Sequence, residues 1–146
     1  MDVKSVYLDT SAIVKRYVLE EHTEQVDDIY DAAYAGDIRI GFSTWNLGEV
    51  AVVLSKYERK GILDSAKAVF NRFMGETRLL VKLGQLKLIP LSFRVIISAI
   101  SYVFKHAIYI ADAVQLASAG GFEAFLTYDK RLAEVAQAEG FRLLHG

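Results

Sequence analysis

The chain has 146 residues, no cysteine and a formal net charge of -1. Apolar residues make up 53% of it, which excludes a disordered tail and suits one domain over residues 1–146. The absence of thiols excludes disulfides, thiolate metal sites and cysteine nucleophiles, and the near-zero charge means that nucleic-acid binding would need a local basic patch.

Apolar periodicity predicts short strands that alternate with helices, with capping oxygens at Asp9, Ser43 and Ser92. The segment 64–84 is expected as one helix, or as two helices with a break at Gly75. Such an alternation indicates the α/β class with a mostly parallel sheet. In chain order the predicted elements are a strand at 3–8, helices at 12–19 and 26–34, a strand at 38–42, helices at 44–60 and 64–84, a strand at 86–89, helices at 92–105 and 110–119, a strand at 124–127, a helix at 130–139 and a last strand at 142–144.

Neither an export signal nor a membrane span is expected. The first residues lack the positive region and following apolar run of a signal peptide. The most apolar stretch, at 95–104, is far shorter than the ~20 residues that a spanning helix needs. We therefore expect a cytoplasmic protein.

Four acidic residues each stand alone in an apolar stretch: Asp9, Glu49, Asp112 and Asp129. A carboxylate near a core is costly unless it is paired, hydrogen-bonded or bound to a metal. Asp9 and Asp129 directly follow predicted strands, and the carboxyl ends of parallel strands form the ligand crevice of an open sheet. Glu49 and Asp112 lie on helix faces away from the apolar stripes. We therefore predict that the four meet in one place and share a cation.

Taken singly, each acid also has an ordinary structural interpretation. Asp9 and Asp129 could be helix N-caps, and Asp112 could be a first-turn acid favoured by the helix dipole. Glu49 could face solvent beside Lys56. The joint pattern favours a shared site over these four separate explanations.

Four motifs carry a resemblance to a known family. They are Tyr-Leu-Asp9-Thr10-Ser11, Ser-Thr-Trp-Asn-Leu-Gly-Glu49, Ile-Ala-Asp112-Ala-Val-Gln-Leu-Ala and Phe-Leu-Thr127-Tyr-Asp129-Lys-Arg-Leu. In order and spacing, the whole chain resembles a PIN-domain ribonuclease of the VapC toxin type. The resemblance implies a three-layer α/β/α sandwich in which the four acids form a metal pocket. It also implies that the hydroxyls of Thr10, Ser11 and Thr127 support this pocket.

The implied reaction is hydrolysis of RNA phosphodiester bonds with Mg²⁺ or Mn²⁺, which prefer oxygen ligands. Our hypothesis is that Asp9 and Asp112 form the core of the metal site. Asp129 and Glu49 would then act through water or orient the nucleophile. Some relatives carry a further carboxylate near the third or fourth motif, and this chain does not, so a second permanently bound metal is not implied. Clustered acids repel one another, so the metal-free pocket should raise one or more of their pKa values.

Basic residues must guide RNA toward such an acidic pocket. Arg16 and Lys130 lie close to the first and fourth motifs, with Lys15 and Arg131 beside them, although each could simply be a solvated helix residue. Trp45 is expected in the core.

The resemblance also implies partners. A toxin of this type pairs with a small antitoxin that covers the pocket, and a homodimer is expected. The apolar helices at 26–34 and 69–83 could supply the dimer face and the antitoxin groove, or could equally be ordinary core helices.

Other classes of protein have sequence requirements of their own. A haloacid-type phosphatase needs a second aspartate where Ser11 stands, and a receiver domain needs paired acids after the first strand. A PIN-like scaffold that acts as a nonenzymatic binding module stays open, as does a PIN nuclease in RNA processing or acting on DNA. The retention of all four acids argues against the scaffold.

Overall fold

The computed structural model describes residues 2–144, and its centre is a sheet of four parallel strands in the order β3-β2-β1-β4. The predicted last strand at 142–144 is not one of them, because only an isolated bridge joins Leu143 to Phe125. The other four predicted strands are confirmed. Their bounds are Ser5–Leu8 for β1, Arg39–Ser43 for β2, Leu86–Ile89 for β3 and Ala124–Leu126 for β4.

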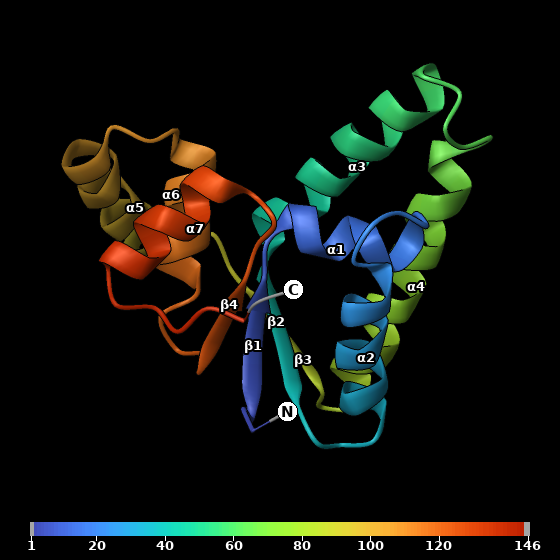
Figure 1. Cartoon of the computed structure of the whole chain (residues 1–146), viewed down its shortest axis with the longest axis horizontal. Helices are drawn as coiled ribbons and strands as arrows, with labels where there is room; N and C mark the ends of the chain where they lie inside the picture. The colour runs from blue at the N-terminus through green and yellow to red at the C-terminus, as the bar shows by residue number, and fades with distance from the viewer. Residues whose placement is uncertain (1, 145–146) are drawn as a thin grey trace.

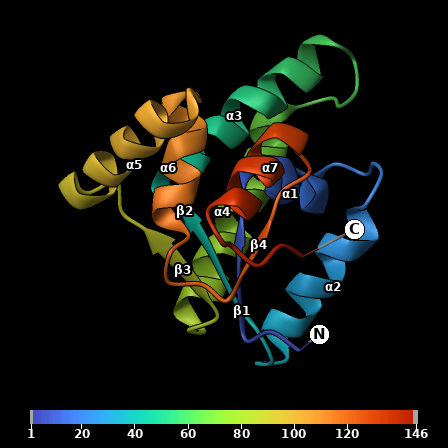
Figure 2. The ribbon, with the colours of Figure 1, turned by 60° about the vertical axis from the view of Figure 1, so that its left-hand side comes forward.

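Helices cover both faces of this sheet. Figure 1 shows the sheet between α5, α6 and α7 on one side and α2 and α4 on the other, and Figure 2 shows α5 and α6 lying side by side. The predicted α/β/α sandwich is therefore confirmed. The helices are α1 (Thr10–Tyr17), α2 (Thr23–Tyr34), α3 (Thr44–Arg59), α4 (Ala66–Lys82), α5 (Phe93–His106), α6 (Ile110–Ser118) and α7 (Lys130–Ala138).

The central strand β1 is buried on both faces, which explains its nearly continuous apolar sequence. Tyr7 pairs with Gly41 of β2 on one side and with Phe125 of β4 on the other. Gly41 is required there, because the Phe122 ring occupies the space where a Cβ would stand. The close packing of Phe122 against the sheet holds the α6 end on this face.

Helix α2 uses its apolar stripe in the core, whereas α4 buries Phe73 and Leu80 and leaves Leu79 and Val81 exposed. In α2 the apolar residues Val26, Ile29, Tyr30 and Ala33 are all buried, so this helix packs into the core rather than offering a surface. Helix α4 runs unbroken through Gly75, because its buried residues keep one continuous stripe against the core. No helix of the described part of the chain is long and apolar enough to cross a membrane.

Candidate active site

All four predicted acids line one pocket of about 570 Å³. Two of them come from loops that follow adjacent strands: Asp9 follows β1, and Asp129 follows β4. The helices after these strands, α1 and α7, leave on opposite sides of the sheet (Figure 1). This is the switch point at which open parallel sheets bind their ligands. Glu49 of α3 and Asp112 of α6 complete the set.

Asp9 is the most buried of the four, with only 4% of its surface exposed. It does cap α1, as one of the two interpretations expected, because Oδ1 accepts a hydrogen bond from the backbone N–H of Ala12 at 3.0 Å. Two hydroxyls also donate to it: Ser11 to Oδ1 at 2.7 Å and Thr127 to Oδ2 at 2.5 Å. Burial raises the pKa of Asp9 to about 6 against the opposing effect of these donors, and the charge of Asp129 adds to the rise.

The same two hydroxyls fasten the first motif to the fourth. Ser11 Oγ accepts a hydrogen bond from the Tyr128 backbone N–H at 2.9 Å, and Thr127 Oγ1 accepts one from the Asp129 N–H at 3.0 Å. Asp9 also donates its backbone N–H to the carbonyl of Leu126 at 3.2 Å. Ser11 and Thr127 thus have the contacts expected of supporting groups, and their role in a reaction stays a prediction.

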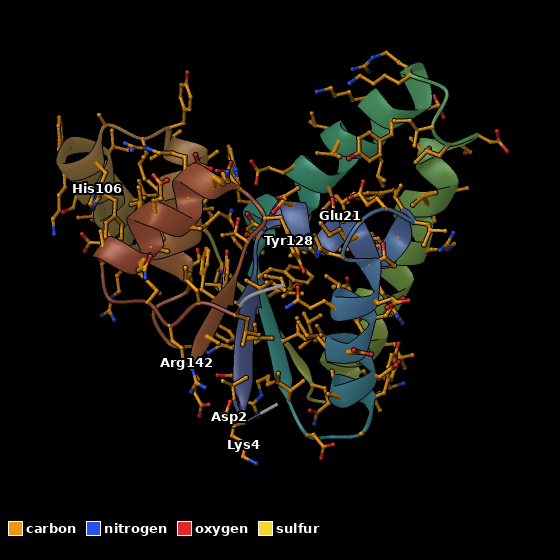
Figure 3. All side chains as sticks on the ribbon, in the orientation of Figure 1. Asp2, Lys4, Glu21, His106, Tyr128 and Arg142 are labelled. Atoms are coloured by element: carbon orange, nitrogen blue, oxygen red, sulfur yellow. The ribbon has the colours of Figure 1, made fainter. Side chains whose placement is uncertain are left out.

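Tyr128 extends this junction toward the segment between α1 and α2, where Figure 3 shows it near Glu21. Its ring stacks on His22 with the ring centroids 4.8 Å apart, and its hydroxyl donates to Gln25. The fourth motif is therefore held against the start of α2.

Glu49 is half-buried and is held by the third predicted hydroxyl, since Thr10 Oγ1 donates to Glu49 Oε1 at 2.8 Å. Burial raises the pKa of Glu49, the hydrogen bonds from Thr10 and Trp45 oppose this rise, and the charge of Asp112 adds to it. None of the described ion pairs joins Glu49 to Lys56, so the solvent-paired interpretation of Glu49 is wrong.

Asp112 stands in the first turn of α6 and is also half-buried. Burial raises its pKa, and the charge of Asp129 contributes. Asp129 itself is exposed and caps α7 by accepting a hydrogen bond from the Leu132 N–H at 3.0 Å. Asp129 therefore acts electrostatically on both Asp9 and Asp112, while Asp112 acts on Glu49, so the four carboxylates form one coupled group.

The donor set of this pocket fits a hydrated oxygen-preferring cation. Among residues 2–144, no three acid or histidine groups stand close enough to grip one ion directly. Mg²⁺, however, usually keeps several waters and takes only one or two carboxylates. The pocket leaves room for such waters, and Asp9 Oδ2 accepts only one hydrogen bond, so it retains a lone pair for a cation.

A buried polar network beneath the pocket was not predicted from the sequence. Asn46 donates from Nδ2 to Thr10 Oγ1 and to Gln115 Oε1, both at 2.9 Å. Tyr7 donates from its hydroxyl to Gln115 Oε1 at 2.8 Å. Asn46 also closes the capping box of α3 with Ser43. The network positions Thr10 and, through it, Glu49. Its sequence signals were the amide three residues after the Ser43 cap and the glutamine one turn after Asp112.

Two of the predicted RNA-contacting cations are engaged within the fold. Arg16 donates from Nε and a terminal nitrogen to Glu76, at 2.9 Å each, and also pairs with Asp27 at 2.9 Å. Lys15 pairs with Glu20 at 3.3 Å. Arg16 lines a separate cavity, and its contacts tie α1 to α2 and α4. The charge of Arg16 is therefore largely balanced by carboxylates of the protein itself.

The cations after the fourth motif are more available. Lys130 and Arg131 are both exposed at the start of α7. Arg131 donates to the carbonyl of His106 at 3.1 Å, and none of the described ion pairs involves Lys130. Of the four candidates, Lys130 is the one whose charge faces solvent beside the acids.

Trp45 corrects an expectation. It was predicted in the core, but 38% of its surface is exposed and it lines the acidic pocket. The reason is its position two residues after the Ser43 cap, in the first turn of α3, where the helix begins at the carboxyl end of β2. Here the aromatic ring forms a wall of the pocket instead of packing inward.

Comparisons with known proteins agree with this architecture. A family model for the PIN domain matches residues 6–138. The fold is similar to that of VapC20 from Mycobacterium tuberculosis, a toxin that cleaves the sarcin-ricin loop, with a TM-score of 0.65, 14% identity and coverage of 97% of this chain and 99% of that one. It is also similar to a chain of VapBC2 from Rickettsia felis, bound to a DNA fragment from their promoter, with a TM-score of 0.57, 15% identity and coverage of 96% and 97%.

No curated protein matches the sequence. The two structural similarities have low identity and establish a shared fold, and the resemblance to PIN-domain proteins of the VapC type is confirmed. Because the family model spans nearly the whole chain, the protein belongs to the PIN domain family.

Proposed function

We propose that this protein is a metal-dependent endoribonuclease, the toxin of a toxin–antitoxin pair. One observation carries the proposal: four carboxylates from distant segments line a single pocket at the switch point of the sheet. Membership of the PIN family and the shared fold with a toxin that cleaves RNA support it.

The four acids are assigned different roles, according to how firmly the fold holds each of them. Asp9 and Asp112 would bind the cation, because Asp9 is fixed by two hydroxyls and a backbone N–H and Asp112 lies half-buried across the pocket. A bound Mg²⁺ or Mn²⁺ lowers the pKa of a water molecule and offsets the negative charge on the phosphate. Asp129 and Glu49 would accept hydrogen bonds from water and orient it toward the phosphorus atom. Thr10 holds the Glu49 carboxylate in place for this role.

The basic residues would act at the mouth of the pocket. Lys130, with Arg131 beside it, would draw the RNA phosphates toward the acids. Lys15 and Arg16 remain proposed contacts of lesser weight, because both already pair with carboxylates of the protein. Exposed cations act over about 10 Å at moderate salt, so RNA affinity should fall as salt rises.

A nonenzymatic scaffold is the main competing function. Holding four acids together, with burial raising the pKa of Asp9 to about 6, opposes folding at neutral pH in the absence of a cation. A protein that only binds a partner would have no use for such a destabilising cluster of acids. The family's toxins pair with an antitoxin, and we extend this pairing to the present chain, with a basic antitoxin side chain among the acids as the expected contact.

The decisive experiment is a cleavage assay on structured RNA, unstructured RNA and DNA, with Mg²⁺, Mn²⁺ or chelator. The protein should cut RNA only with metal, and Asp9→Asn should lower the rate by about 100-fold or more. Asp28→Asn, which changes an exposed aspartate of α2, is the matched control and should cut at the wild-type rate. Activity in chelator, or full activity of the Asp9 variant, would refute the mechanism. Cleavage of DNA alone would assign the other substrate.

A further inference from the structure

The acidic pocket has a second wall that the proposed chemistry does not use. It belongs to one face of α3, where positions 45, 48, 52, 56 and 59 follow one another every three or four residues. The residues on this face change from apolar near the acids to basic at the far end of the helix. They are Trp45, Gly48, Val52, Lys56 and Arg59.

The near half of this face is open and flat. Trp45 is 38% exposed and Val52 is 67% exposed, and both line the pocket with Gly48. A Cβ built at Gly48 meets no atom within 4 Å, so the glycine leaves an open slot one turn from the indole ring. This slot continues into the same cavity that contains the four acids.

One buried polar group of this pocket also lacks a partner. Gln115 is 2% exposed, yet its Nε2 has no hydrogen-bond partner among the described residues, since its Oε1 takes the donors of Tyr7 and Asn46. A buried donor left unpaired is costly, which indicates a ligand or water with an acceptor oxygen or nitrogen. The pocket therefore combines a flat aromatic wall, an open slot and a free donor.

We propose that this wall is a nucleobase subsite, in which an unpaired base of the RNA stacks on Trp45 over Gly48. The proposal rests on the nuclease function argued above. An aromatic ring binds every base through its π-face and needs no charge. That property matters here, because four carboxylates repel the phosphate that must enter the pocket. Gln115 lies behind this wall of the pocket, and a base acceptor would have to reach its buried Nε2 through a water molecule or a small rearrangement.

The rest of this face of α3 predicts the direction in which a bound RNA strand would run. Beyond Val52 the same stripe carries Lys56 and Arg59, both exposed, and none of the described ion pairs involves either of them. A strand whose base stacks on Trp45 would pass its next phosphates along α3 to these cations. This arrangement favours single-stranded RNA or a loop, since a base that is paired in a duplex cannot stack on Trp45 beside Gly48.

The first test uses the single tryptophan of the chain, Trp45, as its own probe. Single-stranded RNA added with Ca²⁺ in place of Mg²⁺, to slow cleavage, should quench its fluorescence. A series of oligonucleotides with one abasic nucleotide at each position in turn should show one sensitive position. Loss of that base should abolish the quenching and raise Kd about tenfold, equivalent to about 1.4 kcal/mol.

The second test uses variants, with Kd measured from the anisotropy of labelled RNA. Gly48→Leu should fill the slot and raise Kd about tenfold, as should Trp45→Ala, while Trp45→Phe should retain part of the affinity. Gly75→Leu is the matched control, because Gly75 is also an exposed helical glycine with open space around it, and it should leave Kd unchanged. Circular dichroism melting of each variant verifies that it is folded.

The outcomes separate this subsite from the nuclease function. Metal-dependent cleavage without quenching, and with no sensitive abasic position, would overturn the subsite and leave the nuclease intact; the wall would then belong to a protein partner. Quenching that depends on one base, in a protein that cuts no RNA with any metal, would support the subsite and refute the nuclease. An unchanged Kd in folded Gly48→Leu would also overturn the subsite.

Discussion

Asp9 combines several features of the candidate site in one side chain. It caps α1, accepts two hydroxyl hydrogen bonds and stays almost fully buried with a pKa of about 6. An ordinary N-cap contributes about 1 kcal/mol and needs no burial. The burial instead keeps the group partly protonated near neutral pH, so that the proposed cation would compete with a proton for the same oxygens.

This competition predicts a pH-dependent stability in the metal-free protein. The pKa of Asp9 is raised above its unfolded value of 3.8, so the folded state holds the extra proton between about pH 4 and pH 6. The contribution of Asp9 to the free energy of unfolding should therefore be most favourable below about pH 4 and should be lost as pH rises from about 4 to about 6, by on the order of 3 kcal/mol. Asp9→Asn keeps a good cap but has no proton to lose, and should remove this part of the slope.

Urea unfolding from pH 4 to pH 8 in chelator measures the difference between the two proteins. The difference should change in favour of the variant between about pH 4 and pH 6 and should stay constant above that range. Saturating Mg²⁺ should stabilise the wild type and release protons, and should do neither in the variant. A difference between the two proteins that does not change with pH would refute the argument.

Thr127 gives a second prediction, because its hydroxyl lowers the pKa of Asp9. Thr127→Val should raise that pKa further and move the acid limb of the pH–rate profile to higher pH, with about tenfold lower cleavage on the acid side. Thr77→Val is the control, since Thr77 is a buried threonine outside the pocket and its hydroxyl has no partner among the described residues. Identical profiles for all three proteins would contradict the role of Thr127.

The sequence predicts the acids far better than their neighbours. A lone carboxylate in an apolar stretch is conspicuous because burial makes it costly, and the four acids do line one pocket. Asn46 and Gln115 gave little signal, because an amide in a helix looks the same whether it faces solvent or a buried network. Trp45 was misplaced because aromatic residues are usually core residues, and only the course of α3 decides otherwise.

At the scale of elements, the sheet depends on one close contact. The Phe122 ring occupies the space above Gly41, and Phe122 also packs edge-on against Tyr7. Gly41→Ala should displace this ring and cost about 1–3 kcal/mol of unfolding free energy. Gly75→Ala, at an open helical position, should instead stabilise by about 0.5–1 kcal/mol. Chemical denaturation of both variants tests the pair, and a neutral Gly41→Ala would contradict the packing argument.

Most elements were predictable because local chemistry and tertiary packing agree. Ser43, Ser65 and Ser92 cap α3, α4 and α5, and in α3 and α4 part of the apolar spacing behind the cap matches the buried residues. The prediction of a strand at 142–144 was wrong, because this segment makes only a single bridge, to Phe125 of β4. Gly75 does not break α4, because packing of Phe73 and Leu80 outweighs the small helix cost of one glycine.

At the scale of the whole molecule, the exposed apolar residues gather on α5. Phe93, Ile97, Ile100 and Phe104 recur at helical spacing and are 38% to 86% exposed. A stripe of this kind marks an interaction surface. The expected homodimer is therefore better supported here than at α2, which exposes Tyr34 but buries Val26, Ile29, Tyr30 and Ala33.

The dimer prediction is direct. Phe104→Glu, which replaces an 86% exposed ring, should convert the protein from dimer to monomer without lowering its melting temperature as a monomer. Light scattering coupled to gel filtration measures the mass across a concentration series. Leu19→Glu, at a 90% exposed leucine after α1, is the control and should stay dimeric. A monomeric wild type at all concentrations would refute the dimer.

The position of β4 affects when the protein could become harmful during its own synthesis. This edge strand pairs with β1 across more than a hundred residues of chain, and the Asp129 loop follows it. A nascent chain on the ribosome therefore cannot close its pocket until nearly the whole sequence has emerged. If the protein is the proposed toxin, incomplete chains would therefore be inactive, and an antitoxin would need to bind only the completed chain.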